Sequence, residues 1–235
     1  MGCQSTRTII RREAGAGGEN RVQLIDLSHS IEAGMFTYKG LPAPIICDFL
    51  SREKARTIYA DGAEFSIQTI EMVGNTGTYL DSPFHRFADG ADLADLPLEQ
   101  LAHLDAIVIR SDKMAVDVEA FEAFDVCGKA VLVQTGWDQH WRTDAYFDNH
   151  PFLTGAAAQH LVDAGAALVG IDSHNIDDTR GTARPVHTTL LGAGIPICEH
   201  MTGLFQLPTS GARFYAVPPK IVALGTFPVR AFAMV

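Results

Sequence analysis

The sequence predicts a single mixed α/β domain, and three observations support this fold class. Short apolar runs typical of strands alternate along the chain with segments typical of helices. Neither an internal repeat nor a linker interrupts residues 21–235. The chain has 235 residues, which is ample for one continuous hydrophobic core.

Strands are predicted where short runs are apolar throughout or alternate between apolar and polar residues. In 64–72, for example, Phe65 and Ile67 share one face while Ser66 and Gln68 lie on the other. The predicted strands are 22–27, 64–72, 106–109, 130–134, 167–171, 195–198, 213–217, 221–224 and 229–235.

Helices are predicted between these strands from their start and stop signals. Thr154 is a favourable N-cap for a helix that closes at Gly165. Another helix is expected to start at Pro97, because proline suits the first helical position. Shorter helices are predicted at 116–124 and 184–191, and loops rich in glycine or proline at 34–44 and 74–90.

The composition restricts the partners of this protein. Its 18 Lys+Arg and 28 Asp+Glu give a formal net charge of −10, which repels phosphate backbones and anionic membrane surfaces. The four cysteines form no CxxC pair, so neither a zinc knuckle nor a redox motif is present. We therefore expect a cytoplasmic protein with a small-molecule substrate, without nucleic-acid or membrane partners.

Residues 1–20 are expected to form a flexible tail that precedes the domain at 21–235. The first six residues, MGCQST, match the short N-myristoylation pattern. That pattern fixes only three residue types and recurs easily by chance, so no lipid anchor is predicted.

Two clusters of polar residues are candidates for chemistry. Asp81 and His85 lie four residues apart in the predicted loop, although a turn cap and an exposed histidine would give the same pattern. His187 and Glu199 flank an apolar helix–strand unit, where a buried carboxylate needs a cation or a proton donor. A surface position for Glu199 is the alternative, and His200 is the weaker candidate because it points to the opposite face of the strand.

A third polar group, 172–178, follows a buried strand and is interpreted mainly as a turn, since Asp and Asn favour turns. The chain contains no G-x-S-x-G elbow, no P-loop and no G-x-G-x-x-G after a strand. It therefore lacks the signatures of serine hydrolases of the α/β type, P-loop NTPases and dinucleotide enzymes.

Taken together, these motifs resemble the cyclase family of hydrolases, which contains bacterial kynurenine formamidase and isatin hydrolase. The family signature H-x-G-T-H-x-D-x-P-x-H is similar to NTGTYLDSPFH at 75–85. Further similarity lies in the stretches DLSH (26–29), TGW (135–137), GIDS (170–173) and PVRA (228–231). The resemblance implies a swivelling β/β/α fold, a homodimer or homotetramer, metal ligands at Asp81, His187 and Glu199, and an acid/base role for His85.

The sequence departs from this signature at two positions, where Asn75 and Tyr79 stand in place of metal-binding histidines. An amide oxygen is a weak ligand, and a phenol must first lose its proton. One interpretation is a single divalent ion, Zn²⁺ or Mn²⁺, held by Asp81, His187 and Glu199. The other is a mechanism without metal, in which Tyr79 and Asn75 donate hydrogen bonds to a developing oxyanion.

The predicted function is hydrolysis of a cyclic or aryl amide, as in an arylformamidase, or of a lactone. His85 would activate the water, since an imidazole side chain suits the role of a general base. Two alternatives remain: a metal-independent cyclase, isomerase or lyase on the same scaffold, and a non-catalytic ligand-binding homologue. Candidates for a flat aromatic substrate pocket are Phe36, Tyr38, Trp137 and Trp141, although core packing is expected for at least two of them.

Overall fold

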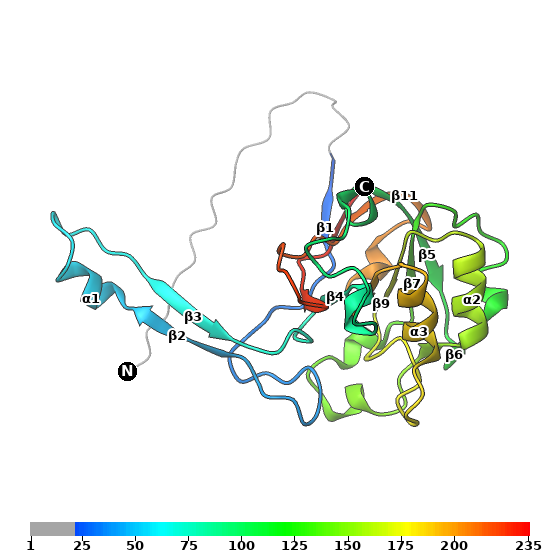
Figure 1. Ribbon diagram of the computed structural model, residues 1–235, viewed down its shortest axis with the longest axis horizontal. Helices are drawn as coiled ribbons and strands as arrows, with labels where there is room; N and C mark the ends of the chain where they lie inside the picture. The colour runs from blue at the N-terminus through cyan, green and yellow to red at the C-terminus, as the bar shows by residue number, and fades with distance from the viewer. Residues whose placement is uncertain (1–21) are drawn as a thin grey trace.

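A nine-stranded mixed sheet forms the centre of the computed structural model, which describes residues 22–235 (Figure 1). The strand order is β1-β13-β11-β5-β7-β9-β10-β4-β12, in which β5, β7, β9 and β10 are parallel and the flanking strands antiparallel. The strands are β1 (Leu24–Asp26), β4 (Tyr79–Asp81), β5 (Leu104–Arg110), β7 (Ala130–Gln134), β9 (Leu168–Ile171), β10 (Ile197–Glu199), β11 (Ser210–Tyr215), β12 (Thr226–Pro228) and β13 (Phe232–Met234).

Each face of the sheet has its own hydrophobic core. Helices α2 (Gly155–Asp163) and α3 (Pro185–Gly192) cover one face, where Val131 and Val133 point toward them. Leu132, between these two valines, packs into the core of the other face. This alternation follows from the two-residue period of a strand, and it explains why the central strands are apolar throughout.

The central elements agree with the sequence prediction, and Thr154 caps α2 by accepting a hydrogen bond from the amide of Ala157. The helix predicted from Pro97 is wrong, because only a 3₁₀ turn, Leu98–Gln100, forms before β5. Residues 116–124 likewise form no α-helix, only the 3₁₀ turn Val118–Ala120 after the end of a short strand. Before it, β6 (Ala115–Val116) pairs with β8 (Phe152–Leu153). No strand forms at 221–224.

The predicted loop at 74–90 contains the buried strand β4, which pairs with β10 on one side and β12 on the other. Three residues are too few to establish a periodic pattern, so the sequence did not predict this strand. After β4, a 3₁₀ helix, η1 (Pro83–His85), turns the chain toward α3.

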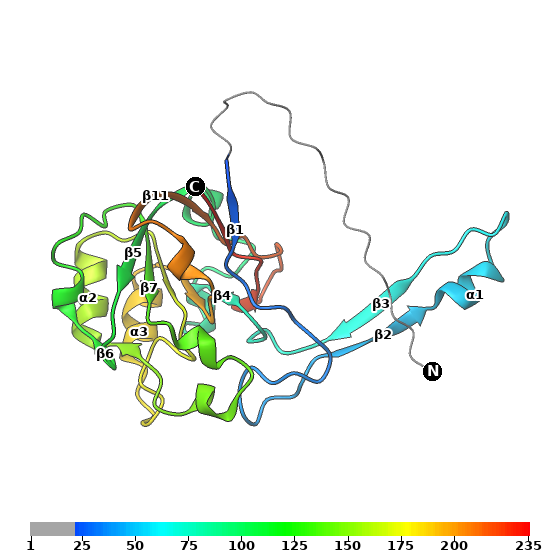
Figure 2. The same cartoon turned by 180° about the vertical axis from the view of Figure 1, so that it is seen from behind.

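A two-stranded ribbon, the arm (residues 45–71), projects from the body of the protein (Figures 1 and 2). It consists of β2 (Ile45–Leu50), the short helix α1 (Arg52–Arg56) and β3 (Ile67–Glu71). The strand predicted at 64–72 is thus present, but all of β3 is exposed. An isolated ribbon of this kind has little stability by itself in water.

The predicted tail at 1–20 and its myristoylation-like pattern lie outside the described residues. Within residues 22–235, no helix is long and apolar enough to cross a membrane.

Candidate active site

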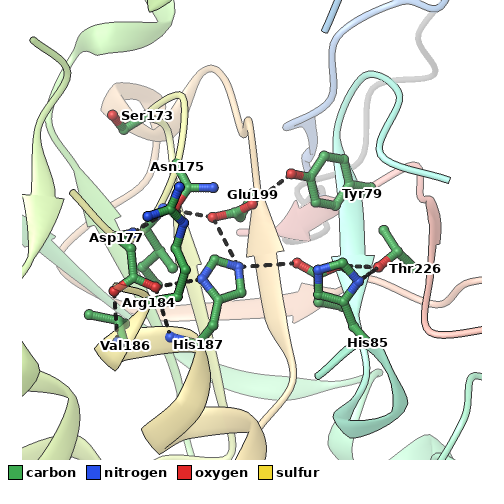
Figure 3. Close-up of polar contacts among 12 residues, drawn as sticks. Tyr79, His85, Ser173, Asn175, Asp177, Arg184, Val186, His187, Glu199 and Thr226 are labelled. Carbon is green, nitrogen blue, oxygen red and sulfur yellow. Dashed lines mark hydrogen bonds and ion pairs between the residues drawn. The ribbon is translucent and has the colours of Figure 1, made fainter. Parts of the chain in front are cut away.

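A cleft of about 510 Å³ lies between β4, η1, α3 and the end of β10. Its lining includes Asn75, Tyr79, His85, His187 and Glu199, five of the residues predicted from the sequence. Figure 3 shows His187 between Asp177 and His85, with Glu199 and Tyr79 beside them. Segments far apart in the sequence therefore meet at one cleft.

The pairing of β4 with its two neighbours places the carboxylates. Tyr79 is directly opposite Glu199 of β10, and Asp81 is directly opposite Thr226 of β12. Because Tyr79 and Asp81 are two residues apart in a strand, all these side chains share one face of the sheet. Asp81 and Glu199 are both almost completely buried, so a surface position for Glu199 is wrong. Asp81 accepts from the Thr226 hydroxyl and does not cap a turn, whereas His85 is exposed, as the alternative expected.

Asp177, in the segment before α3, holds His187 in place. Its carboxylate accepts hydrogen bonds from the amides of Val186 (2.7 Å) and His187 (3.0 Å) and from His187 Nδ1 (2.7 Å). It therefore satisfies backbone donors at the first turn of α3 and fixes the imidazole. His187 Nε2 then faces Glu199 Oε1 at 3.6 Å and Asp81 Oδ2 at 3.7 Å.

The supporting role of Asp177 was not predicted, because 172–178 was interpreted mainly as a turn. That interpretation does hold for Asn175 and Asp178, whose side chains accept hydrogen bonds from the amides two residues further on, whereas Asp172 accepts from the distant amides of Thr135 and Gly136. The sequence did offer one indication of this role: an acidic residue precedes the helix that begins with Pro185, and negative charge is favourable near a helix N-terminus.

The floor of the cleft favours positive charge. Burial alone would lower the pKa of His187, but Glu199, Asp177 and Asp81 together raise it to about 10. Burial, opposed by His187, raises the pKa of Glu199 to about 7. Asp81 Oδ2 is buried and accepts no hydrogen bond from residues 22–235. One imidazolium cannot neutralise three carboxylates, so the site suits an additional cation.

Three side chains are close enough to share a metal ion. Asp81, His85 and His187 each offer a ligand atom, and these atoms lie within 4.8 Å of one another. Glu199, the third predicted ligand, adds an oxygen next to His187 Nε2. The nitrogen and oxygen donors of this set fit a divalent ion such as Zn²⁺ or Mn²⁺.

The hydroxyl of Tyr79 is already engaged. It donates to Glu199 Oε2 at 2.6 Å, and burial, with the charge of Glu199, raises the pKa of Tyr79 well above 10. A phenol has a single proton to donate, so the predicted role of Tyr79 as an oxyanion donor is not supported. The side chain of Asn75 lines the cleft and forms no hydrogen bond within residues 22–235; it is the available donor of the predicted pair.

Only one of the four aromatic residues predicted to bind substrate, Tyr38, lines the cleft. Phe36 is exposed elsewhere, Trp137 donates to the carbonyl of Tyr146, and Trp141 stacks on His29 with ring centroids 4.0 Å apart. None of these three lines the cleft, so the pocket prediction was wrong for them. Trp137 and Trp141 contact other residues of the fold, as the alternative of core packing expected. His200 is completely buried and lies outside the cleft lining, although its Nε2 is 3.3 Å from Tyr79 Oη.

The rim of the cleft is basic. Arg86 follows η1 and donates from Nε to Thr188 of α3, while Arg184, directly before α3, donates to backbone carbonyls. Within residues 22–235, neither guanidinium forms a salt bridge with a carboxylate, in contrast to Arg180 with Asp178. The cleft is thus acidic at its floor and basic at its rim.

Comparison with known proteins shows a consistent pattern of similarity. The family model Cyclase matches residues 25–178. Kynurenine formamidase from Salinibacter ruber is 28% identical over 214 residues, covering 88% of this chain and 95% of that protein. Kynurenine formamidase from Geobacillus thermodenitrificans is 26% identical over 174 residues, covering 73% and 81%.

Solved structures share the fold. Isatin hydrolase A from Labrenzia aggregata, bound to benzyl benzoate, superposes with a TM-score of 0.75 at 22% identity, covering 91% of this chain and 94% of that one. A structure described as a potential metal-dependent hydrolase with cyclase activity gives 0.75 at 24% identity, covering 91% and 98%.

Proposed function

Because this chain belongs to the Cyclase family, we propose that it is a hydrolase of an aryl or cyclic amide, or of a lactone. The observation that carries the proposal is that ligand atoms of Asp81, His85 and His187 lie within 4.8 Å of one another, and that both histidines line the cleft. The similarity to kynurenine formamidases and isatin hydrolase supports the amide class of substrate.

In the proposed reaction His85 acts as the general base. Its side chain is 35% exposed and lines the cleft, so a water molecule can reach it. The imidazole accepts a proton from this water while the oxygen attacks the substrate carbonyl carbon. The same proton then passes to the leaving nitrogen or oxygen as its bond to the carbonyl carbon breaks, which leaves a carboxylic acid.

We propose that Asp81, His187 and Glu199 hold one divalent ion, Zn²⁺ or Mn²⁺. When bound, the ion would supply positive charge that polarises the carbonyl of the substrate. The unpartnered Asp81 Oδ2 and the orientation of His187 Nε2 toward both carboxylates support this ligand set. Asp177 contributes by keeping the His187 ring in position through its Nδ1.

The charge of the cleft supports a substrate that carries an anionic group beside the scissile bond. Arg86 and Arg184 offer guanidinium donors at the rim, whereas the buried carboxylates repel an anion from the floor. An anionic substrate would therefore enter with its neutral carbonyl toward His85, and Tyr38 would contact its apolar part.

We also propose a homodimer or homotetramer. The arm exposes Phe49 (78%), Ile70 (57%) and Ile45 (55%), and such apolar surface is usual where another chain packs. A monomer in solution by light scattering would contradict this proposal.

The decisive experiment measures turnover on aryl formamides, cyclic amides and lactones, with and without EDTA. We expect hydrolysis of at least one class, and loss of activity in His85→Ala. His160→Ala on α2, outside the cleft lining, is the matched control and should retain activity. Activity that survives His85→Ala would refute the assigned base, and ligand affinity without turnover on any class would identify a binding protein instead.

A further inference from the structure

Thr226, on edge strand β12, contacts both the proposed base and its carboxylate neighbour. Its side chain is almost completely buried, and its hydroxyl is hydrogen-bonded to Asp81 Oδ1. The same hydroxyl oxygen lies 2.7 Å from His85 Nδ1. Figure 3 shows Thr226 on the side of His85 away from His187. The contact follows from the sheet, because Thr226 is the residue of β12 directly opposite Asp81.

The direction of these two hydrogen bonds follows from the groups involved. A hydroxyl has one proton to donate, and an ionised carboxylate can only accept. The Thr226 hydroxyl therefore donates to Asp81 and accepts from His85, which requires a proton on His85 Nδ1. In the neutral imidazole, the lone pair is then on Nε2.

The backbone around Thr226 is tightly packed against the site. A Cβ added to Gly225 would lie 2.5 Å from the amide nitrogen of His85, and one added to Gly74 would lie 2.3 Å from the carbonyl oxygen of Thr226. The carbonyl of Gly225 also accepts a hydrogen bond from the Ser82 amide at 2.8 Å. The two glycines allow this close approach, and Thr226 itself is β-branched and stiff at χ1. The hydroxyl is thus held in one place relative to His85.

We infer that Thr226 is a positioning residue, which keeps His85 in the tautomer with Nδ1 protonated and leaves Nε2 free to accept a proton. Thr226 acts through His85 and does not touch substrate itself. The tautomer depends only on the geometry described, whereas its kinetic consequence rests on the proposed function.

The direct test is ¹⁵N NMR of the full chain, labelled at the histidine ring nitrogens and prepared with Zn²⁺ as the only divalent ion. Spectra at about pH 8, above the ordinary pKa of histidine, report the neutral tautomers, and the His85 signals are assigned by their loss in His85→Asn. Wild type should show Nδ1 protonated. Thr226→Val, which keeps the shape but removes the hydroxyl, should shift His85 toward a mixture of tautomers, and Thr226→Ser should restore the wild-type signals.

A matched control is Thr202→Val, which removes another threonine–carboxylate hydrogen bond, to Asp138, outside the cleft lining. It should leave the His85 signals unchanged. The inference is wrong if wild-type His85 is protonated on Nε2, or if Thr226→Val leaves the tautomer unchanged.

Kinetics provide the second readout. Thr226→Val should lower kcat by about 10- to 100-fold, with a much smaller change in KM, because general base catalysis is impaired while binding is kept. Thr226→Ser should recover most of the rate. Absence of turnover in wild type on every substrate class would refute the proposed function, but the NMR result would still decide the role of Thr226.

Discussion

Asp177→Asn should weaken both the fold and the site, because one carboxylate serves three donors. In wild type the buried Asp177 accepts hydrogen bonds from two amides of α3 and from the His187 ring. Asparagine has one acceptor oxygen, and its NH₂ group would face a donor. At least one donor is then left unsatisfied.

The expected decrease in the free energy of unfolding follows from the hydrogen bonds that are lost. Hydrogen bonds to a charged acceptor contribute about 1.5–3 kcal/mol each, and an unsatisfied buried donor costs about 1–3 kcal/mol. The side-chain oxygen of asparagine can still accept one of these hydrogen bonds, which preserves part of the stability. We expect a net loss of about 3 kcal/mol, or a decrease of about 6–12 °C in Tm for a domain of this size. Loss of the fixed imidazole should also weaken Zn²⁺ binding by about 10- to 100-fold.

The assays are thermal denaturation followed by circular dichroism and Zn²⁺ competition against a chromophoric chelator. Asp178→Asn is the matched control: this neighbouring carboxylate is paired with exposed Arg180 at the surface, so neither measurement should change much. If Asp177→Asn had the Tm and Zn²⁺ affinity of wild type, Asp177 would stabilise neither the first turn of α3 nor the position of the His187 ring.

Three further predictions address the metal, the substrate and the effect of pH. Elemental analysis of protein purified without chelators should find about one divalent ion per chain, and much less in Asp81→Asn; full occupancy in that variant would exclude Asp81 as a ligand. Arg86→Gln should raise KM for a substrate with a carboxylate beside the scissile bond but not for its neutral ester, and equal effects on both would refute the role of the rim. Burial lowers the pKa of His174 to about 3, below that of an unfolded histidine, so the unfolded chain binds more protons and stability is lost as pH falls below about 6.5. Urea denaturation should show that protonation of this group lowers the free energy of unfolding by roughly 3 kcal/mol at pH 4. His174→Gln should abolish this decrease, and equal pH dependence in both proteins would contradict the prediction.

The sequence predicted the central elements of the fold because their signals are local. An apolar run such as 130–134 and an N-cap such as Thr154 act within a few residues, and both elements are present. The arm was predicted only in part, since the exposure of β3 depends on what the ribbon packs against. Strand β4 is too short for its period to be recognised.

The same difference between local and long-range signals applies to the residues of the candidate site. The resemblance to the cyclase family brought together Asp81, His85, His187 and Glu199, which the fold places near one another. Thr226 could not be predicted, because its importance depends on the register between β12 and β4. The prediction that the Tyr79 hydroxyl is free to donate to an oxyanion was wrong for a similar reason. Its acceptor, Glu199, lies on another strand.

The position of β4 between β10 and β12 has a consequence for biosynthesis. During translation, residues 79–85 leave the ribosome long before residues 197–199 and 226–228, with which they pair or make contact. Until these later strands are available, the Asp81 carboxylate has no neighbouring strand on either side in the sheet. The proposed site therefore forms only after β12 has been synthesised, and a nascent polypeptide that stops before β12 is expected to lack it.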